Sequence, residues 1–387
     1  MPELPHEAKR RSPTMPRRSL LQAGAVGIGA LTAASAMPAV ASASVARAPT
    51  GQQTSRRADR CRTRLVLLGT AAGPSPRMGR LGMASALVVG DRAYLVDAGR
   101  GMVDQVARAE IPFGSISDVL VTHLHSDHVA ELFNLFLLTW GNENPNRSTI
   151  SRPVGVWGPG PAGALPPARD GRPAVTVEPQ TPGLVEYFER SLQANAYDVN
   201  VRVRDTGRPD IRSVYQLHEL ALPAGAGPGH DDLAPEMQPF LVFEDDRVRV
   251  HATLVHHPPM FPCYAFRFDT EDGSVVFSGD TTASSNLVRL ARAADVLVHE
   301  VIETSYYEAQ NWPPGRLAHL RESFTDVSEV GAVAAAADVR TLVLSHLAPG
   351  DPEAVPDSTW HRKASQGFDG QVIVGHDLLQ IGVGAPG

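Results

Sequence analysis

Short apolar runs of strand length recur along the chain, and each ends in a polar turn with glycine, aspartate or histidine. β-Branched residues are frequent in these runs, which is typical of buried strands. In the N-terminal half, from residue 64 to about residue 157, the pattern predicts strands at Leu65–Leu68, Ser85–Val89, Ala93–Val96 and Val119–Thr122. An apolar segment of helical length, Val129–Trp140, follows the last of them.

A second strand-rich half extends from about residue 240 to residue 383. The predicted strands are Val248–Thr253, Ser274–Thr281, Val296–Val298 and Thr341–His346. Two predicted helices, Asn286–Ala294 and Val327–Ala337, alternate with them. Such alternation in two halves fits an α/β fold, a four-layer αβ/βα sandwich in which two sheets pack together and helices cover the outside.

Between the halves, residues 158–236 are rich in Pro and Gly, and we predict a loop-rich insertion with one helix, Pro182–Ala194. Its aromatic and basic residues either contact an anionic or aromatic substrate or form ordinary packing and solvated faces. They are Tyr187, Phe188, Arg190, Tyr197, Arg202 and Arg204. The predicted loop from Tyr306 to Pro314 is a better candidate for an apolar pocket wall.

Residues 1–43 are predicted to be a cleaved export signal of the twin-arginine type. Arg17 and Arg18 precede an apolar stretch, residues 23–41, that is rich in small residues and ends in A-x-A pairs typical of a cleavage site. A retained membrane span and an amphipathic arm are the alternatives. We therefore expect a periplasmic or secreted protein without a stable membrane anchor. A flexible linker, residues 44–61, would lead to a single domain at residues 62–387.

Charge and cysteine content bear on the substrate and on the compartment. The 387 residues carry a net charge of −7, and because residues 1–43 contribute +3, the remainder carries −10. RNA affinity comes largely from neutralised phosphates, so this acidic balance predicts that nucleic acid is not a substrate. Only Cys61 and Cys263 are present, which excludes a disulfide framework. Cys263 either lines a pocket near His257 or is a small buried residue.

The most informative motif is the H-x-H-x-D-H run from His123 to His128, directly after the strand that ends at Thr122. Extended backbone directs His123 and His125 to the same side, and Asp127 and His128 are expected in the first turn of the following helix. Nitrogen and oxygen ligands of this kind suit zinc or a neighbouring first-row metal. A solvated histidine cluster is the weaker alternative, because crowded polar rings need partners.

Three further residues of metal-ligating type stand at the ends of predicted strands: His257, Asp280 and His346. Sheet folds gather their active sites at the carboxyl ends of strands. Each residue alone would be an ordinary loop residue, but together with the histidine run they complete a set of seven candidate ligands.

With these motifs the chain resembles the metallo-β-lactamase-fold hydrolases, in the branch that contains tRNA 3′-processing endonucleases (tRNase Z) and arylsulfatase-like or phosphodiesterase-like enzymes. The similarity covers roughly residues 62–383. Besides the histidine run, it rests on Leu65–Thr70, Asp97–Gly99, Gly158–Gly160, Ala265–Phe268, Phe277–Thr281, Val298–Glu300, Leu344–His346 and Phe368–Gly370. The four-layer sandwich is the fold that this resemblance implies.

The resemblance also implies two metal ions and assigns their ligands. The first ion would be bound by His123, His125 and His257, the second by Asp127, His128 and His346, and Asp280 would bridge them. Two Zn²⁺ are expected, with Mn²⁺ or Fe²⁺ as the alternative at one site, and a hydroxide held between them would attack the substrate. Asp97 resembles the family's aspartate that orients a ligand imidazole, and a strand-end cap is the alternative reading.

Two positions separate this chain from other members of the family. Asp280 stands where the antibiotic-hydrolysing members usually carry cysteine, which disfavours a β-lactamase. The tRNA-processing members carry a histidine that assists leaving-group departure, and Phe324 aligns with it. Phenylalanine cannot donate a proton, so a substrate with a good leaving group is expected unless His319 compensates.

These observations together predict an exported, zinc-dependent dinuclear hydrolase of a small ester, such as an aryl sulfate, a phosphodiester or a lactone. Catalytic roles are expected for Asp127, which would orient the hydroxide, and for His299 and Glu300, which face the same side in the family. The alternatives are a tRNase Z-like endonuclease and a non-catalytic metal-containing binding protein. A homodimer is the open alternative to a monomer.

Overall fold

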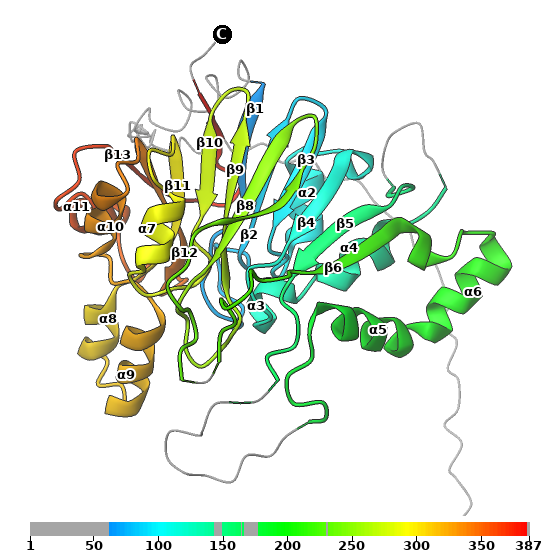
Figure 1. Cartoon of the computed structure of the whole chain (residues 1–387), viewed down its shortest axis with the longest axis horizontal. Coiled ribbons are helices and arrows are strands. Elements are labelled where there is room, and N and C mark those ends of the chain that lie inside the picture. The colour runs from blue at the N-terminus through cyan, green and yellow to red at the C-terminus, as the bar shows by residue number, and fades with distance from the viewer. Residues whose placement is uncertain (1–61, 143–148, 164, 166–176, 230, 385–387) are drawn as a thin grey trace, which may run out of the picture. The chain divides into compact units, whose positions relative to one another are not determined.

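The computed structural model describes residues 62–142, 149–163, 165, 177–229 and 231–384, which contain two seven-stranded sheets (Figure 1). The predicted export signal, the predicted linker and Cys61 lie outside the described residues. Within the described residues, every helix is too short or too polar to cross a membrane.

The first sheet contains the N-terminal strands and closes with the last strand of the chain. In spatial order its strands are β14 (Gln380–Gly382), β1 (Thr63–Gly69), β2 (Ala84–Val89), β3 (Arg92–Val96), β4 (Ile116–Leu120), β5 (Val154–Gly158) and β6 (Tyr215–Glu219). β3 to β6 run parallel, so their carboxyl ends meet at one edge of the sheet. The remaining pairs are antiparallel.

The second sheet contains the C-terminal strands. In spatial order they are β13 (Gln371–Val374), β12 (Thr341–Ala348), β11 (Val296–Ile302), β10 (Ser274–Phe277), β9 (Tyr264–Thr270), β8 (Val248–Leu254) and β7 (Phe240–Glu244). β10 to β13 run parallel to one another. The pairs β7–β8, β8–β9 and β9–β10 are antiparallel. This sheet therefore also gathers several carboxyl ends at one edge.

Alternation of side chains along the strands separates the layers. Leu65 and Leu67 of β1 join Phe266 and Val298 in the core between the two sheets. Val66 of β1 instead belongs to a core shared with helices of the first sheet. Those helices are α2 (Met102–Arg108), α4 (Leu132–Thr139), α5 (Leu184–Ala194) and, at its edge, α6 (Ala196–Thr206).

The outer face of the second sheet is covered by α7 (Ser285–Leu290), α10 (Val330–Ala336) and α11 (Asp357–Ala364) (Figure 1). Leu287, Val330 and Trp360 from these helices are buried in the same core as Leu342 of β12. The order of layers is helix, sheet, sheet, helix, and the predicted four-layer αβ/βα sandwich is confirmed.

Several predicted elements differ from the observed ones in their ends. The single helix predicted at residues 129–140 is two helices, α3 (Ser126–Val129) and α4. The helix is interrupted at Glu131. The carboxylate of Glu131 accepts the backbone N–H groups of Gly101 and Val103 over 2.7 and 2.8 Å. The strand predicted at residues 274–281 ends at Phe277, and the strand predicted to end at His346 continues to Ala348.

The middle of the chain is more helical than predicted. Residues 196–206 form α6, and part of the predicted loop at residues 306–314 belongs to α8 (Thr304–Ala309), which α9 (Pro314–Ser323) follows. Phe188 is buried in the helix-facing core, and Tyr187 donates its hydroxyl to the carbonyl of Val129 over 2.9 Å. Arg190, Arg202 and Arg204 form ion pairs with Glu186, Asp198 and Asp205. These contacts favour the packing and solvation alternative for this segment.

Candidate metal centre

The histidine run lies where the carboxyl ends of β3 to β6 meet. β4 ends at Leu120, and the chain continues through Thr122 to His123 before α3 begins at Ser126. Asp127 and His128 therefore lie in the first turn of α3, and both are buried.

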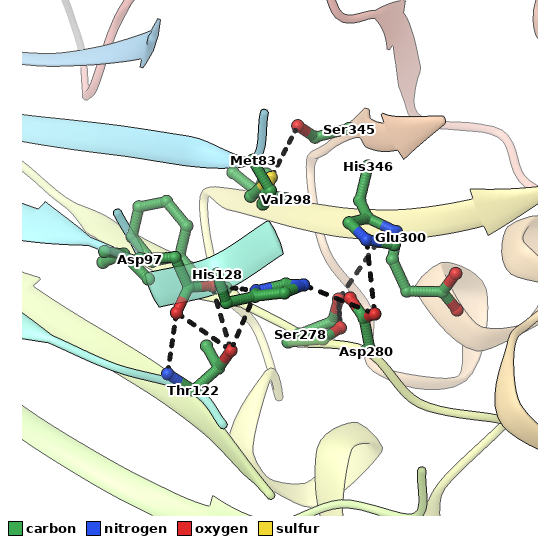
Figure 2. A pocket seen from close by; sticks show the side chains of 13 residues that line it. Met83, Asp97, Thr122, His128, Ser278, Asp280, Val298, Glu300, Ser345 and His346 are labelled. Carbon is green, nitrogen blue, oxygen red and sulfur yellow. Dashed lines mark hydrogen bonds and ion pairs between the residues drawn. The ribbon is translucent and has the colours of Figure 1, made fainter. Parts of the chain in front are cut away.

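The second sheet contributes three more candidate ligands. His257 follows β8 by three residues, and Asp280 follows β10 by three residues. His346 is the extra residue of a β-bulge within β12, because Ser345 and Leu347 pair with consecutive residues of β11. Its φ of 43° is in the left-handed region. A bulge redirects a side chain, and here the imidazole of His346 points toward Asp280 (Figure 2).

Three imidazoles converge in a first group of candidate ligands, His123, His125 and His257. His123 Nε2 lies 2.9 Å from His125 Nδ1, and His125 Nδ1 lies 3.1 Å from His257 Nε2. A second group consists of Asp127, His128 and His346. Asp127 Oδ2 lies 3.4 Å from His346 Nε2 and 3.7 Å from His128 Nε2.

Asp280 lies between the two groups. Its Oδ2 atom is 3.7 Å from His257 Nε2 and 4.0 Å from His123 Nε2 in the first group. The same oxygen is 3.4 Å from His128 Nε2 and 3.3 Å from His346 Nε2 in the second group. All seven residues that the sequence indicated as candidate ligands are therefore brought together in space.

Unpartnered buried atoms indicate that these groups can accept a cation. Among the described residues, His128 Nε2, Asp280 Oδ1 and His346 Nδ1 have no hydrogen-bond partner. An unsatisfied buried polar group costs about 1–3 kcal/mol, so each of these atoms needs a compensating partner. Imidazole nitrogens with carboxylate oxygens are the donors that zinc and its first-row neighbours prefer. The residues fit a divalent metal.

Burial and crowding keep the first group neutral. Burial lowers the pKa of His123 well below its ordinary value, and the neighbouring imidazoles lower it further. Burial and then His257 lower the pKa of His125 to about 4. Neutral imidazole is the form that binds metals, so this group is in the binding form at physiological pH.

The carboxylates of Asp280 and of Asp127 in the second group favour the ionised form. Burial alone would raise the pKa of Asp280, but His346 and His128 outweigh it and hold the pKa below its ordinary value. The pKa of Asp127 is lowered in the same way, by His128 and His346 against burial. Burial lowers the pKa of His128, yet Asp280, Asp97 and Asp127 raise it well above its ordinary value. These buried carboxylates attract either a proton or, in its place, a metal cation.

Hydrogen bonds to neighbouring residues that are not themselves candidate ligands orient several of the candidate ligands. A carboxylate only accepts, so His128 Nδ1 donates to Asp97 Oδ2 over 2.8 Å, which leaves Nε2 facing Asp280 (Figure 2). Asp97 also accepts the N–H of Thr122 over 2.8 Å. His257 Nδ1 donates to the carbonyl of Ser323 over 2.7 Å. The contact with His128 favours an orienting role for Asp97 over that of a strand-end cap.

Phe324 borders both ligand groups. Its ring centroid lies 5.1 Å from that of His257 and 5.8 Å from that of His346, nearly parallel to the latter at 21°. This apolar ring places no proton donor beside the imidazoles. His319 lies one turn earlier on α9, where its Nδ1 is 3.2 Å from Ser323 Oγ.

Glu300 and His299 are neighbours on β11 with different surroundings. Glu300 lines a small cavity of about 10 Å³ together with Asp280 and His346 (Figure 2). Burial, reinforced by Asp280, raises the pKa of Glu300 well above its ordinary value. His299 is not among the residues that line this cavity; its Nδ1 donates to the carbonyl of Glu300 over 2.6 Å, and burial lowers its pKa to about 4. The two side chains therefore do not share this cavity.

The sequence of the chain matches a known family. Residues 79–346 match the Metallo-beta-lactamase superfamily. The chain belongs to this superfamily. Membership makes it a hydrolase of a superfamily that uses divalent metals. The two ligand groups described above, with Asp280 between them, agree with this.

Several superfamily relatives of the chain are named ribonuclease Z. The relative from Mycobacterium bovis (strain BCG / Pasteur 1173P2) is 30% identical over 319 residues, which cover 82% of this chain and 98% of the relative. The relative from Mycobacterium avium (strain 104) is 30% identical over 322 residues, which cover 83% of this chain and 99% of the relative. Human tRNase Z, short form, is 20% identical with a TM-score of 0.54 over 83% of this chain and 100% of that one, which supports the superfamily fold.

These relatives overturn one expectation. The acidic balance of the chain predicted that nucleic acid is not a substrate, whereas ribonuclease Z is named for action on RNA. Net charge is a sum over the whole chain and does not describe the local charge where a substrate binds. The exclusion of nucleic acid on the basis of net charge is therefore wrong.

Two residues that the sequence did not indicate hold the ligands through backbone atoms. Ser323 accepts from His257 through its carbonyl, and Gly73 donates its N–H to Asp127 Oδ2 over 2.9 Å. Almost any residue carries these backbone groups, so the identity of Ser323 does not indicate that its carbonyl holds His257. Gly73 has a φ of 77°, which favours glycine, and the glycine after β1 was the one available sign.

Metal removal is expected to destabilise this superfamily member. A ligand that binds only the folded state stabilises it by about 4 kcal/mol at a free concentration about 1,000 times its dissociation constant. We therefore expect a chelator to lower the melting temperature by several degrees and added Zn²⁺ to restore it, as measured by scanning calorimetry. An equal melting temperature with and without metal would contradict metal binding by the folded chain.

Proposed function

We propose that the chain is a metal-dependent phosphodiesterase that binds two divalent cations and cleaves RNA. The observation that carries the proposal is the position of Asp280 Oδ2, which lies within 4.0 Å of ligand nitrogens in both groups. One carboxylate oxygen within reach of two ligand groups supports two neighbouring cations. The RNA substrate is supported by the mycobacterial relatives named ribonuclease Z, which match along nearly their whole length.

We assign each ligand group to one cation. His123, His125 and His257 would hold the first cation, Asp127, His128 and His346 would hold the second, and Asp280 would contribute to both. When bound, two such cations polarise a phosphoryl oxygen and lower the pKa of water enough to provide a nucleophile near neutral pH. Zinc is proposed for both positions because of the nitrogen and carboxylate donors, with Mn²⁺ or Fe²⁺ as the alternative at one.

Residues beside the ligands have separate proposed roles. Asp127 orients the attacking water, because its carboxylate is held by the N–H of Gly73 and faces His346. Glu300 accepts the N–H of Thr325 over 2.7 Å, which holds the chain next to Phe324. For His299 the geometry supports a structural role, since its Nδ1 is bonded to a backbone carbonyl.

A second candidate function is hydrolysis of a small ester with a good leaving group, such as an aryl phosphodiester, an aryl sulfate or a lactone. Phe324 favours it, because its ring contacts His257 and His346 and cannot protonate a departing alkoxide. An aryl leaving group needs little protonation, whereas the ribose oxygen released from RNA needs more.

A direct comparison of substrates tests the two candidates. The metal-loaded full chain is incubated with a tRNA precursor that carries a 3′ extension and, separately, with bis(p-nitrophenyl) phosphate. The proposal predicts metal-dependent cleavage of both. Hydrolysis of the aryl ester with intact RNA would reject the RNA substrate in favour of the second candidate. Bound metal without hydrolysis of either substrate would indicate a non-catalytic binding protein.

Substitution of Asp97 tests how the second group is oriented. Asp97→Asn is expected to weaken metal binding about 10–100-fold, because an amide cannot accept from both His128 Nδ1 and Thr122 as the carboxylate does. The control is Asp118→Asn, in which a part-buried aspartate that accepts from Trp157 Nε1 over 2.9 Å is changed in the same way. Equal metal affinities in both variants, measured by chelator competition, would argue against the orienting role.

Export is proposed from the sequence alone. Arg17, Arg18 and the apolar stretch at residues 23–41 support a signal that is removed near residue 43. Cell fractionation followed by N-terminal sequencing tests this proposal. A full-length chain that stays in the cytoplasm would reject it without affecting the metal centre.

A further inference from the structure

A largely buried polar network of Arg80, Thr70 and Asp377 includes none of the candidate metal ligands. Arg80 is 3% exposed, and its Nη1 donates to Thr70 Oγ1 over 2.8 Å and to the carbonyl of Gly375 over 2.6 Å. Thr70 Oγ1 in turn donates to Asp377 Oδ1 over 2.8 Å, and Asp377 Oδ2 accepts the N–H of Leu81 over 2.6 Å. Burying such charges is costly, and these hydrogen bonds offset part of the cost.

This network joins two segments that are far apart in the sequence. Thr70 and Leu81 are the ends of the loop that follows β1, and Asp377 and Gly375 come from the segment after β13. The backbone also joins the loop ends, because Ala71 donates its N–H to the carbonyl of Leu81 over 2.9 Å. Arg80, Thr70 and Asp377 therefore anchor both ends of residues 70–81.

The same loop holds the residue next to His346. Leu347 donates its N–H to the carbonyl of Thr70 over 2.9 Å, and its own carbonyl accepts the N–H of Ala72 over 3.2 Å. On the other side of β12, Leu347 pairs with Val301 of β11. The bulge that redirects His346 is thus held between β11 and the loop, and a shift of residues 70–72 would release one of its two sides.

The loop also holds the carboxylate of the second group. Gly73 follows Ala72 directly, and its N–H donates to Asp127 Oδ2 over 2.9 Å. An ideal Cβ added to Gly73 would meet no atom within 4 Å, so packing alone does not hold this residue in place. The position of its N–H depends on the anchored residues 70–72 before it.

We infer that Arg80, Thr70 and Asp377 are positioning residues that set the affinity of the second cation site, formed by Asp127, His128 and His346. The inference rests on the proposed dinuclear centre. The three residues act through residues 70–73, which contact Asp127 on one side and Leu347 on the other. Within the described residues they make no such connection to the first group, so we expect the effect at one of the two cations only.

Stepwise metal removal from the full chain tests this inference. Metal-loaded wild type, Asp377→Asn and Thr70→Val are titrated with a competing zinc chelator, and metal content is measured by atomic emission. Thr70→Val keeps the shape of the side chain but removes the hydroxyl that links Arg80 to Asp377. Loss of such outer partners typically weakens metal binding about 10–100-fold, and we expect this loss for the second equivalent of zinc only.

The matched control is Asp295→Asn at the opposite end of the second sheet. Asp295 Oδ2 accepts the N–H of Ser274 over 2.8 Å and Oδ1 accepts from Arg340 over 2.9 Å, which resembles the surroundings of Asp377. This variant is expected to release both equivalents as the wild type does. Circular dichroism and melting temperature establish that each variant is folded, and Thr70→Val replaces Asp377→Asn if the latter does not fold.

The outcomes separate the inference from the proposed function. Unchanged affinity for the second equivalent in folded Asp377→Asn or Thr70→Val would overturn the inference, as would equal weakening of both equivalents or the same loss in Asp295→Asn. A wild type that binds fewer than two zinc ions would refute the dinuclear centre itself. A wild type that binds two ions but leaves RNA intact would reject only the proposed substrate.

Discussion

Replacement of Asp280 by alanine is expected to lower kcat/KM for phosphodiester hydrolysis by a factor of about 10³ or more, which corresponds to about 4 kcal/mol of lost transition-state stabilisation. The reason is the position of its Oδ2 atom, 3.7 Å from His257 Nε2 and 3.3 Å from His346 Nε2. No other carboxylate oxygen of the described residues has ion-pair contacts to both groups. Loss of this oxygen therefore weakens the binding of both cations.

The measurement is initial-rate kinetics with bis(p-nitrophenyl) phosphate, accompanied by metal analysis of the same preparation. Asp118→Ala serves as the control, because it removes a part-buried aspartate whose Oδ1 accepts from Trp157 and which belongs to neither ligand group. A variant Asp280→Ala that is folded and retains more than about a tenth of the wild-type rate would be incompatible with a bridging carboxylate.

Substitution of Phe324 by histidine is expected to increase hydrolysis of substrates with poor leaving groups. A positioned general acid contributes about 10²–10⁴-fold, and an imidazole introduced at Phe324, whose ring lies 5.1 Å from His257 and 5.8 Å from His346, is expected to recover about 10-fold of this. Aryl phosphodiesters with acidic phenols need no such proton, so their rates should change little.

The measurement is the dependence of kcat/KM on leaving-group pKa across a series of aryl and alkyl phosphodiesters. Phe324→His is expected to flatten this dependence, and the control Phe324→Leu, which also removes the ring but cannot donate a proton, is expected to retain it. The same slope in both variants would mean that Phe324 does not occupy the position from which a leaving group is protonated.

The contiguous histidine run was predictable because strand and helix geometry places its members over short distances. His123 and His125 follow a strand, and Asp127 and His128 lie in the first turn of α3, as local periodicity indicated. Asp280 could be located because parallel strands gather their carboxyl ends at one edge. The two-sheet architecture followed from the same apolar pattern, since alternating side chains fill the core between the sheets.

Features that depend on tertiary contacts were not predictable. The bulge at His346 has a left-handed φ of 43° that the sequence Leu-Ser-His-Leu does not favour, and it exists because β11 and residues 70–72 hold both sides of Leu347. The carbonyl of Ser323 and the N–H of Gly73 act through the backbone, which carries no residue-specific signature. Likewise α6 contains four polar or charged residues that pair locally, a pattern equally typical of a solvated loop.

The substrate, too, could not be predicted from the sequence, because it depends on the folded surface. A net charge of −7 describes the whole chain and led to the exclusion of nucleic acid, which the relatives named ribonuclease Z overturn. Substrate choice depends on the local surface next to the two ligand groups, where the ring of Phe324 places no proton donor beside His257 and His346. The metal centre and the substrate are therefore tested by separate experiments.

The most direct test of the dinuclear centre is the metal content of the purified chain, measured by atomic emission after removal of loosely bound ions. Two equivalents of divalent metal per chain are predicted for the wild type, with at most one in Asp280→Ala. A wild type that holds fewer than two equivalents, or one whose metal content is the same after Asp280 is replaced, would contradict the dinuclear centre.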